Sequence, residues 1–271
     1  MKIKKLDHLS EIYEEYDAFL IDLWGVMHNG IRLNPSAMNA VRELEEKGKK
    51  VIFLSNAPRP TNKVIKFLKK LNMQEKYLKN VLTSGEAAIK SLKENKFGKK
   101  FYHLGPERDD SLFIDIKQNK TSLEKCDFIL CTGLFDNEYD NLKYYQDLLR
   151  DFTKKKLVCT NPDLIVHRGE EEEYCAGKIA EIFEKMGGEV IYFGKPYKEV
   201  YLSCLDKNQK TLVIGDNINT DIKGANNMNL DSIFITSGVH SSKINNNREA
   251  IVKLLSEKNV SANFFQNELT W

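Results

Sequence analysis

The sequence lacks the features that would assign it to several specialised classes of protein. Its five cysteines are odd in number and form no C-x-x-C pair, which argues against a disulfide framework and a cysteine zinc site. No apolar run approaches the roughly 20 residues of a membrane span, and no apolar signal core follows Lys4-Lys5-Leu6. The 41 basic and 39 acidic residues leave a net charge of only +2, which gives no case for nucleic-acid or membrane binding. A cytoplasmic protein is the default expectation.

The composition that remains is that of a globular protein. Apolar residues make up 41% of the chain and charged residues 30%, which favours a folded chain over a disordered one. The length of 271 residues exceeds the usual size of one domain. One large domain and a core with an inserted second domain therefore both fit.

The first third of the chain has the pattern of a parallel α/β sheet. Ala18-Phe19-Leu20-Ile21 is an unbroken apolar run, typical of a strand buried on both faces, and it ends on Asp22. Residues 37–47 carry apolar side chains at helical spacing, and residues 51–54 form a second strand that ends on Ser55. Because strand, helix and strand make a crossover unit, both polar strand ends should lie at one edge of the sheet.

The last third of the chain repeats this pattern. Val190-Ile191-Tyr192-Phe193 is predicted to be a strand that leads to Lys195. Residues 211–215 form another apolar run, which ends on Asp216, and Thr220-Asp221 would open the following helix. Polar side chains are therefore expected at four strand ends of one sheet.

The middle of the chain differs in character and reads as a separate α/β unit of roughly 100 residues, a normal domain size. We therefore predict an α/β fold in which a core domain, residues 1–80 and 188–271, is interrupted by an inserted domain, residues 81–187. Within the insertion, the acidic run Glu170-Glu171-Glu172-Glu173 predicts a solvated helix start.

Each polar residue at the core strand ends has a physical role around a phosphoryl group. A carboxylate such as Asp22 can attack phosphorus and form an aspartyl phosphate. Ser55 and the backbone of Asn56 can donate hydrogen bonds to phosphate oxygens, and Lys195 can offset their charge. Asp216 would repel Asp22 unless a cation lay between them, and hard oxygen ligands of this kind suit Mg²⁺. Taken alone, Ser55 would also fit a strand-end cap.

The order of these residues resembles the haloacid dehalogenase-like (HAD) hydrolase superfamily over nearly the whole chain. The insertion lies where members with a type-II (C2) cap carry it, and Asn161-Pro162-Asp163 resembles a cap signature of subclass IIA, the nitrophenyl-phosphatase-like branch. That branch also holds phosphatases for glycolate and pyridoxal phosphates and bacterial nucleotide phosphatases. The implied fold is a Rossmann-like parallel-sheet HAD core with a smaller inserted α/β cap domain. The four matching motifs are Asp22-Leu23-Trp24-Gly25-Val26, Leu54-Ser55-Asn56, Gly194-Lys195-Pro196 and Gly215-Asp216-Asn217-Ile218-Asn219-Thr220-Asp221.

The resemblance implies a role for each matched residue. Asp22 would be the nucleophile and a metal ligand, Asp216 a second ligand, and the backbone carbonyl of Trp24 a third. Asn217 would bind on the phosphate side, and Asp221 would orient metal-bound water and the lysine, although alone it also fits a helix cap. The metal would be Mg²⁺ and the substrate a small phosphorylated metabolite. Because family members often pair through the cap, a homodimer is a further expectation.

One position departs from the pattern of the family's phosphatases. Two residues after the nucleophile, these enzymes carry an aspartate that protonates the leaving alcohol and then activates water. This sequence has Trp24 there, which can do neither. General acid–base help is typically worth about 10²–10⁴ in rate, so poor leaving groups should be hydrolysed slowly. His28 is the nearby titratable candidate that could take over.

Three functions stay open on this sequence. The leading prediction is a Mg²⁺-dependent phosphatase that acts on a small phosphate ester through an aspartyl phosphate, with weak turnover. A metal-independent dehalogenase is the second, because dehalogenases of the superfamily carry an aromatic residue where Trp24 stands; residues 30–50 are, however, too short to hold their cap. The third is a phosphometabolite-binding protein without efficient catalysis. If only the acid is missing, Trp24→Asp should raise activity on poor leaving groups.

Overall fold

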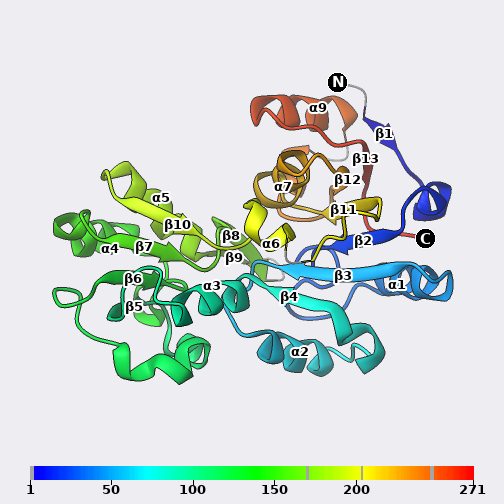
Figure 1. Ribbon diagram of the computed structural model, residues 1–271. Helices are drawn as coiled ribbons and strands as arrows, with labels where there is room; N and C mark the ends of the chain where they lie inside the picture. The colour runs from blue at the N-terminus through cyan, green and yellow to red at the C-terminus, as the bar shows by residue number, and fades with distance from the viewer. Residues whose placement is uncertain (1–2, 169–170, 203, 245–246) are drawn as a thin grey trace.

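The computed structural model describes residues 3–168, 171–202, 204–244 and 247–271. Two parallel β-sheets, each with helices on both faces, form two lobes that lie side by side (Figure 1). We call the lobe with the larger sheet the core and the lobe with the smaller sheet the cap. Both ends of the chain lie on the core (Figure 1). The architecture confirms the predicted α/β fold with a parallel-sheet core and a smaller inserted α/β unit.

The core sheet has seven strands, and every neighbouring pair is parallel. The chain leaves β2 toward β3 and β4, and later returns to the other side of β2 with β11. This reversal of direction makes the carboxyl ends of β2 and β11 the place where parallel α/β sheets bind ligands. The order across the sheet is β1 (Lys4–Lys5), β13 (Phe264–Gln266), β12 (Asp231–Ile235), β11 (Thr211–Gly215), β2 (Ala18–Ile21), β3 (Lys50–Ser55) and β4 (Val81–Thr83).

Helices cover both faces of the core sheet because side chains alternate along each strand. Phe19 and Ile21 of β2 share an apolar cluster with α1 and α2, whereas Leu20 shares one with α6 and α7. A third cluster joins Phe234 of β12 to α9. The core helices are α1 (Pro35–Glu46), α2 (Thr61–Lys70), α6 (Lys198–Leu202), α7 (Lys223–Asn227), α8 (Ser241–Ile244) and α9 (Arg248–Glu257).

The cap sheet repeats this architecture on a smaller scale. Ile129 of β6 shares an apolar cluster with α4 and α5, and Phe128 of the same strand shares one with α3. The four strands are all parallel, in the order β10 (Glu189–Tyr192), β7 (Lys156–Cys159), β6 (Phe128–Cys131) and β5 (Phe101–Leu104). The cap helices are α3 (Ser84–Lys93), α4 (Leu142–Leu149) and α5 (Ala176–Lys185).

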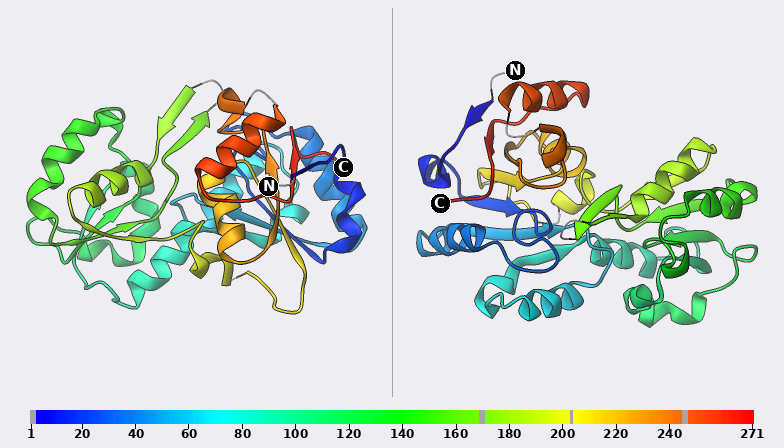
Figure 2. Two further views of the ribbon diagram at one scale, coloured as in Figure 1. Left: turned by 90° about the horizontal axis from the view of Figure 1, so that it is seen from above. Right: turned by 180° about the vertical axis from the view of Figure 1, so that it is seen from behind.

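An antiparallel hairpin of β8 (Ile165–Arg168) and β9 (Glu171–Tyr174) lies between the two lobes (Figures 1 and 2). The helix start predicted for the acidic run is wrong, because Glu171, Glu172 and Glu173 lie in β9; Glu170 is outside the described residues. Across the hairpin, His167 Nε2 lies 3.7 Å from a carboxylate oxygen of Glu172. The guanidinium of Arg168 also pairs with Glu173 at 3.1 Å, and cross-strand contacts of this kind suit a hairpin better than four like charges suit one turn of helix.

Strand pairing differs from the prediction at both domain boundaries. β4, which the prediction gave to the insertion, is the edge strand of the core sheet. β10, which the prediction gave to the core, pairs with β7 of the cap sheet over four residue pairs. The strands at the two places where the chain passes between core and cap are both short and apolar. Only their pairing partners show to which sheet each belongs.

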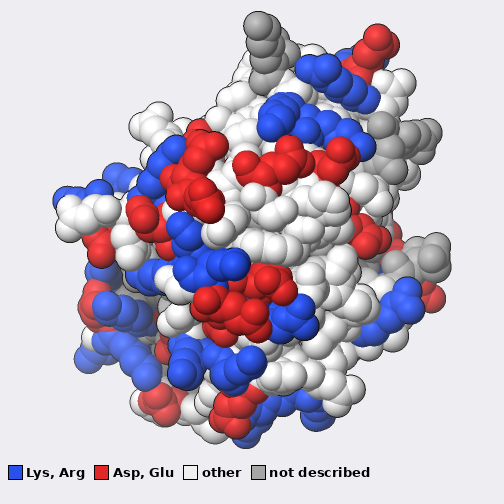
Figure 3. All heavy atoms as spheres, turned by 90° about the vertical axis from the view of Figure 1, so that its right-hand side faces the viewer, with Lys and Arg blue, Asp and Glu red and all other residues white. Residues whose placement is uncertain are grey.

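The surface of the core carries mixed charge. Figure 3 views the molecule from the right-hand side of Figure 1. On this face, lysine and arginine side chains are interspersed with aspartate and glutamate side chains. Mixed signs of this kind give that face no large field of one sign, in keeping with the small net charge of +2. Within the described part of the chain, no helix is both long enough and apolar enough to cross a membrane.

Candidate active site

Four charged side chains meet beside the carboxyl ends of β2 and β11. Lys195 joins them from the segment that follows β10 of the cap sheet, and not from a strand of the core sheet as the sequence predicted. Lys195 Nζ donates to Asp22 Oδ1 at 2.6 Å and to Asp221 Oδ1 at 2.7 Å. Asp216 follows β11 directly, beside Asp22 at the end of β2. The carboxylates of Asp22, Asp216 and Asp221 each offer an oxygen, and these oxygens lie within 4.8 Å of one another. The fold therefore gathers four of the residues that the sequence singled out.

Backbone amides orient these carboxylates. Asp221 Oδ2 accepts a hydrogen bond from the N–H of Asn217 at 3.1 Å, and Asp216 Oδ2 accepts one from Val239 N–H at 2.8 Å. Asp221 lies inside a π-helical segment, η7 (Ile218–Ile222), which starts right after Asn217. Asp221 therefore binds both the backbone N–H of Asn217, the N-cap residue of this turn, and the ammonium of Lys195.

The side chain of Asp216 fits where it does because two neighbouring residues are glycines without a Cβ atom. A Cβ on Gly25 or on Gly238 would lie 2.1 Å from Asp216 Oδ2, closer than any side chain tolerates. Gly25 also has a φ of +92°, a backbone conformation that other residues rarely adopt. The glycine three residues after Asp22 is therefore required for the approach of the loop to Asp216.

The cluster contains three acidic side chains and one basic side chain. Burial raises the pKa of Asp22 well above its usual range, although Lys195 opposes the rise. Burial also raises the pKa of Asp216 to about 7, and repulsion by Asp221 adds to it. Burial disfavours charge on Lys195, but the surrounding carboxylates outweigh this effect and raise its pKa. One ammonium thus faces three buried carboxylates.

A divalent cation fits this imbalance. Of the residues that the structure describes, Asp22, Asp216 and Asp221 are the one group of three acidic, histidine or cysteine side chains close enough to share an ion. All three offer hard carboxylate oxygens, with no thiolate or imidazole among them. Hard donors of this kind suit Mg²⁺ better than Zn²⁺ or copper.

Ser55 and Asn56 lie at the end of β3, next to Asp22, and both are buried. Ser55 Oγ accepts the N–H of Ala57 at 3.1 Å. The amide of Asn56 accepts the N–H of Lys195 at 2.8 Å and donates to the carbonyl of Lys195 at 3.1 Å. The side chain of Asn56 therefore holds the lysine's backbone in place, a function that the sequence prediction of phosphate binding did not include.

Asn217 connects the core to the cap. Its side-chain oxygen accepts the N–H of Asn219 at 2.9 Å, and its amide nitrogen donates to Asp163 Oδ1 at 3.2 Å. Burial raises the pKa of Asp163 to about 6, although nearby Lys195 opposes the rise. The motif Asn161-Pro162-Asp163 carries no sequence signal that Asp163 lies against the charged cluster, as it does in the structure.

Trp24 points its indole toward the cap. Nε1–H donates to the carbonyl oxygen of His167 in β8 at 2.6 Å. The ring of His28 packs edge-on against the indole, with ring centroids 5.1 Å apart. Burial lowers the pKa of His28 to about 4, and its Nδ1 accepts the N–H of Gly30 at 3.0 Å. His28 is therefore neutral near pH 7 and poorly suited to protonate a leaving group in place of the missing acid.

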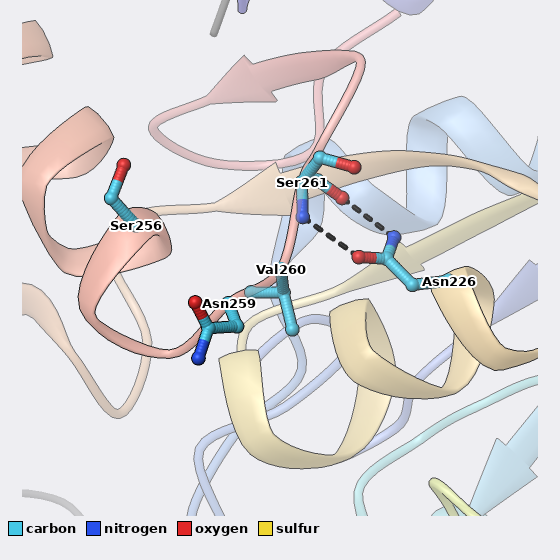
Figure 4. Close-up of a pocket in the computed structure, with 5 residues that line it drawn as sticks. All are labelled: Asn226, Ser256, Asn259, Val260 and Ser261. Carbon is cyan, nitrogen blue, oxygen red and sulfur yellow. Dashed lines mark hydrogen bonds between the residues drawn. The ribbon is translucent and has the colours of Figure 1, made fainter.

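A surface pocket lies at the opposite edge of the core sheet (Figure 4). Asn226 lies in the last turn of α7, which leads into β12, and Ser261 precedes β13, which puts both at the amino ends of the strands. The Asn226 amide donates to the Ser261 carbonyl and accepts its N–H, both at 2.7 Å (Figure 4). The residues that line this pocket carry no titratable group: Asn226, Ser256, Asn259, Val260 and Ser261.

Two protein-family profiles match two separate parts of the chain, the first of which continues from the core into the cap. The profile described as haloacid dehalogenase-like hydrolase matches residues 19–116, and the one described as HAD-hydrolase-like matches residues 192–257. Together they span more than half of the chain and include all four charged residues of the cluster. The chain belongs to the haloacid dehalogenase-like hydrolases.

Relatives of this hydrolase span most of its length. It is 25% identical to the 5'-nucleotidase YutF of Bacillus subtilis over 232 residues, 83% of this chain and 88% of the relative. It is 24% identical to the chloroplastic phosphoglycolate phosphatase 1A of Arabidopsis thaliana, over 89% of this chain and 74% of that protein. The crystal structure of a haloacid dehalogenase-like hydrolase from Brucella suis superposes with a TM-score of 0.86 at 27% identity, covering 98% of this chain and 100% of the other. These similarities confirm the predicted superfamily and branch.

Proposed function

We propose that this hydrolase is a Mg²⁺-dependent phosphatase that acts on a small phosphate ester through an aspartyl phosphate at Asp22. The observation that carries the proposal is the contact of Asp22 with Lys195 at 2.6 Å, inside a buried cluster of three carboxylates. One relative is named as a phosphoglycolate phosphatase, which supports hydrolysis of a phosphate ester as the reaction. We propose a small phosphorylated metabolite as the substrate and the cytoplasm as the location. Both proposals rest on the sequence.

The chain's own residues account for the steps of the reaction. A carboxylate oxygen of Asp22 attacks phosphorus, a P–O bond to Asp22 forms, and the bond to the leaving oxygen breaks with its electron pair. Lys195 offsets charge on the phosphoryl oxygens, and the hydroxyl of Ser55 donates a hydrogen bond to them. Mg²⁺ held by Asp22, Asp216 and the backbone carbonyl of Trp24 would supply further positive charge there. Water then attacks phosphorus, the P–O bond to Asp22 breaks with its electron pair and restores the carboxylate, and inorganic phosphate leaves while a proton of the water passes to solvent.

The absence of an acid at position 24 restricts the leaving group. The indole N–H of Trp24 is already bound to His167, and the low pKa of His28 leaves it unprotonated. An ester oxygen with a low pKa departs as an anion without help, whereas an alkoxide needs a proton. We therefore expect aryl phosphates to react much faster than alkyl phosphates.

Hydrolysis of nitrophenyl phosphate tests the proposal. We expect phosphate release with Mg²⁺, loss of release with a chelator, and a decrease of about 10³-fold or more in Asp22→Asn, because the nucleophile is gone. Asp151→Asn is a matched control, since Asp151 is an exposed aspartate of the cap. Metal-independent chloride release from 2-chloropropionate would favour the dehalogenase instead. If the protein binds phosphate but shows no turnover, whether or not Mg²⁺ is present, the result would favour a phosphometabolite-binding protein.

A further inference from the structure

Trp24 connects the loop that carries the nucleophile to the cap. It follows Asp22 by two residues, and its indole N–H donates to the carbonyl of His167 in β8 at 2.6 Å. This hydrogen bond crosses from the core to the β8–β9 hairpin, which lies between the two lobes (Figures 1 and 2). A phenylalanine or a carboxylate at position 24 could not donate it.

The core side of the contact is built to hold the indole in one place. The ring of His28 packs edge-on against Trp24, and Phe67 of α2 packs edge-on against His28 with centroids 5.5 Å apart. The loop is closed by hydrogen bonds from Gly25 N–H to the His28 carbonyl at 2.8 Å and from His28 N–H to the Leu23 carbonyl at 3.0 Å. The burial of His28 therefore serves to support the indole.

The space next to the indole is also limited. A Cβ on Gly30 would lie 2.7 Å from Trp24 Cζ2 and 3.6 Å from Cγ of Arg168 in β8. The same segment of the cap has a second contact with a loop of the active site, from the amide of Asn217 to Asp163. Two loops of the core thus bind residues 163–167 of the cap, one at each end of that segment.

We propose that Trp24 is a positioning residue, which holds the β8–β9 hairpin of the cap against the loop of the nucleophile at the position where phosphatases of the family carry their acid. The inference rests on the proposed function, because a cap that closes on the active site excludes water and positions the substrate. The indole lowers the free energy of the closed arrangement relative to the open one. Substrate affinity then depends on the fraction of molecules that are closed.

The test removes the donor and keeps the ring. β-(3-Benzothienyl)alanine at position 24 replaces the indole N–H by sulfur with nearly the same shape, and 5-fluorotryptophan, which keeps the N–H, is the matched control. Two-stranded hairpins are marginally stable alone, so the amides of β8 and β9 depend on docking for protection from hydrogen exchange. We expect their exchange to accelerate about fivefold to tenfold in the benzothienyl variant, the range that one neutral hydrogen bond supports.

Kinetics with nitrophenyl phosphate give the second measurement. In the benzothienyl variant we expect KM to rise by about fivefold to tenfold and kcat to fall by less, whereas the fluorinated protein should behave like the wild type. Trp271→Phe is a further control, because the only other tryptophan packs against Tyr13 at 4.9 Å. In the Trp271→Phe background, the fluorescence of Trp24 reports whether the indole moves when phosphate binds.

The outcomes separate this inference from the proposed function. Unchanged exchange in β8 and β9 together with unchanged KM would overturn the positioning role, even in an active phosphatase. Faster exchange in a protein without phosphatase activity would support the role of Trp24 and contradict the proposed function. If the benzothienyl protein does not fold, Trp24→Phe with the same exchange measurement gives the answer.

Discussion

The core and the cap use the same architecture, but only in the core do two neighbouring strands end on carboxylates. Both are parallel sheets with helices on both faces. The strands β2 and β11 of the core end on Asp22 and Asp216. In the cap, β5 is followed by Gly105, β6 by Thr132 and β7 by Thr160. The fourth cap strand, β10, leads through two residues to Lys195, which crosses to the carboxylates of the core. A parallel sheet therefore offers a site at its carboxyl edge without determining that chemistry will be placed there.

The difference lies in the connections as much as in the residues. The core chain reverses direction between β2 and β11, which opens a crevice there, whereas the cap strands follow one another across the sheet in chain order. The loop after β7 reaches the site through Asp163, and the segment after β10 reaches it through Lys195. The core therefore supplies the three carboxylates, and the crossing from the cap back to the core supplies the ammonium.

The largest expected effect comes from removing the lysine of the core cluster. Lys195→Met leaves three buried carboxylates without their ammonium partner, and breaking a buried ion pair typically costs about 3–5 kcal/mol of unfolding free energy. Urea denaturation in metal-free buffer measures this loss, and turnover of nitrophenyl phosphate should be abolished. Added Mg²⁺ should restore part of the stability because it binds the folded carboxylates.

The matched control is a lysine of the cap. Lys156 pairs with Glu189 across β7 and β10 at 3.0 Å, but both side chains are at least half exposed. Lys156→Met should therefore cost less than about 1 kcal/mol, as exposed ion pairs do. Equal losses in the two variants would show that charge is no more tightly coupled in the core than in the cap.

A smaller effect is expected from a buried histidine of the cap. Burial lowers the pKa of His103 to about 4, despite Asp110 Oδ1 at 3.2 Å from its Nδ1. In the unfolded chain, His103 binds a proton as the pH falls through about 6.5. In the folded chain it binds that proton only near pH 4. The contribution of His103 to the free energy of unfolding should therefore be largest above pH 6.5. It should fall by up to about 3 kcal/mol as the pH decreases toward 4.

Denaturation at pH 7 and pH 5 measures that slope. His103→Gln keeps a polar group near Thr132, whose hydroxyl lies 2.9 Å from His103 Nε2, and removes the titration. The variant should therefore lose less stability on acidification than the wild type. His8→Gln is the control, because His8 is exposed on the core. A wild-type slope in His103→Gln would mean that the acid sensitivity arises elsewhere.

The smallest expected effect comes from adding an acid to the core. Trp24→Asp supplies the missing carboxylate, but it removes the hydrogen bond to His167 and places a fourth acid beside the cluster. We expect no gain on alkyl phosphates and a loss of about tenfold in kcat/KM on nitrophenyl phosphate. Trp24→Asn, of the same size and without charge, is the control. A selective gain on alkyl phosphates in the aspartate variant would show that the acid alone is missing.

Much of the core could be predicted from the sequence, because its strands are unbroken apolar runs. The run at residues 211–215 is observed as β11, and the one at residues 18–21 as β2. The strands β1 and β13 were not predicted, since they are two and three residues long and carry no periodicity. The hairpin β8–β9 was missed because its acidic strand has no apolar pattern.

The sequence by itself determined which side chains form the charged cluster, because Asp22, Lys195, Asp216 and Asp221 each stand at a strand end or in the turn that follows one. Tertiary structure alone decided what Trp24 does. Its partner is a backbone carbonyl 143 residues away, and a carbonyl group is present at every residue. Such a contact leaves no signature in the sequence, and it exists because the fold brings the hairpin of the cap to the loop of the nucleophile.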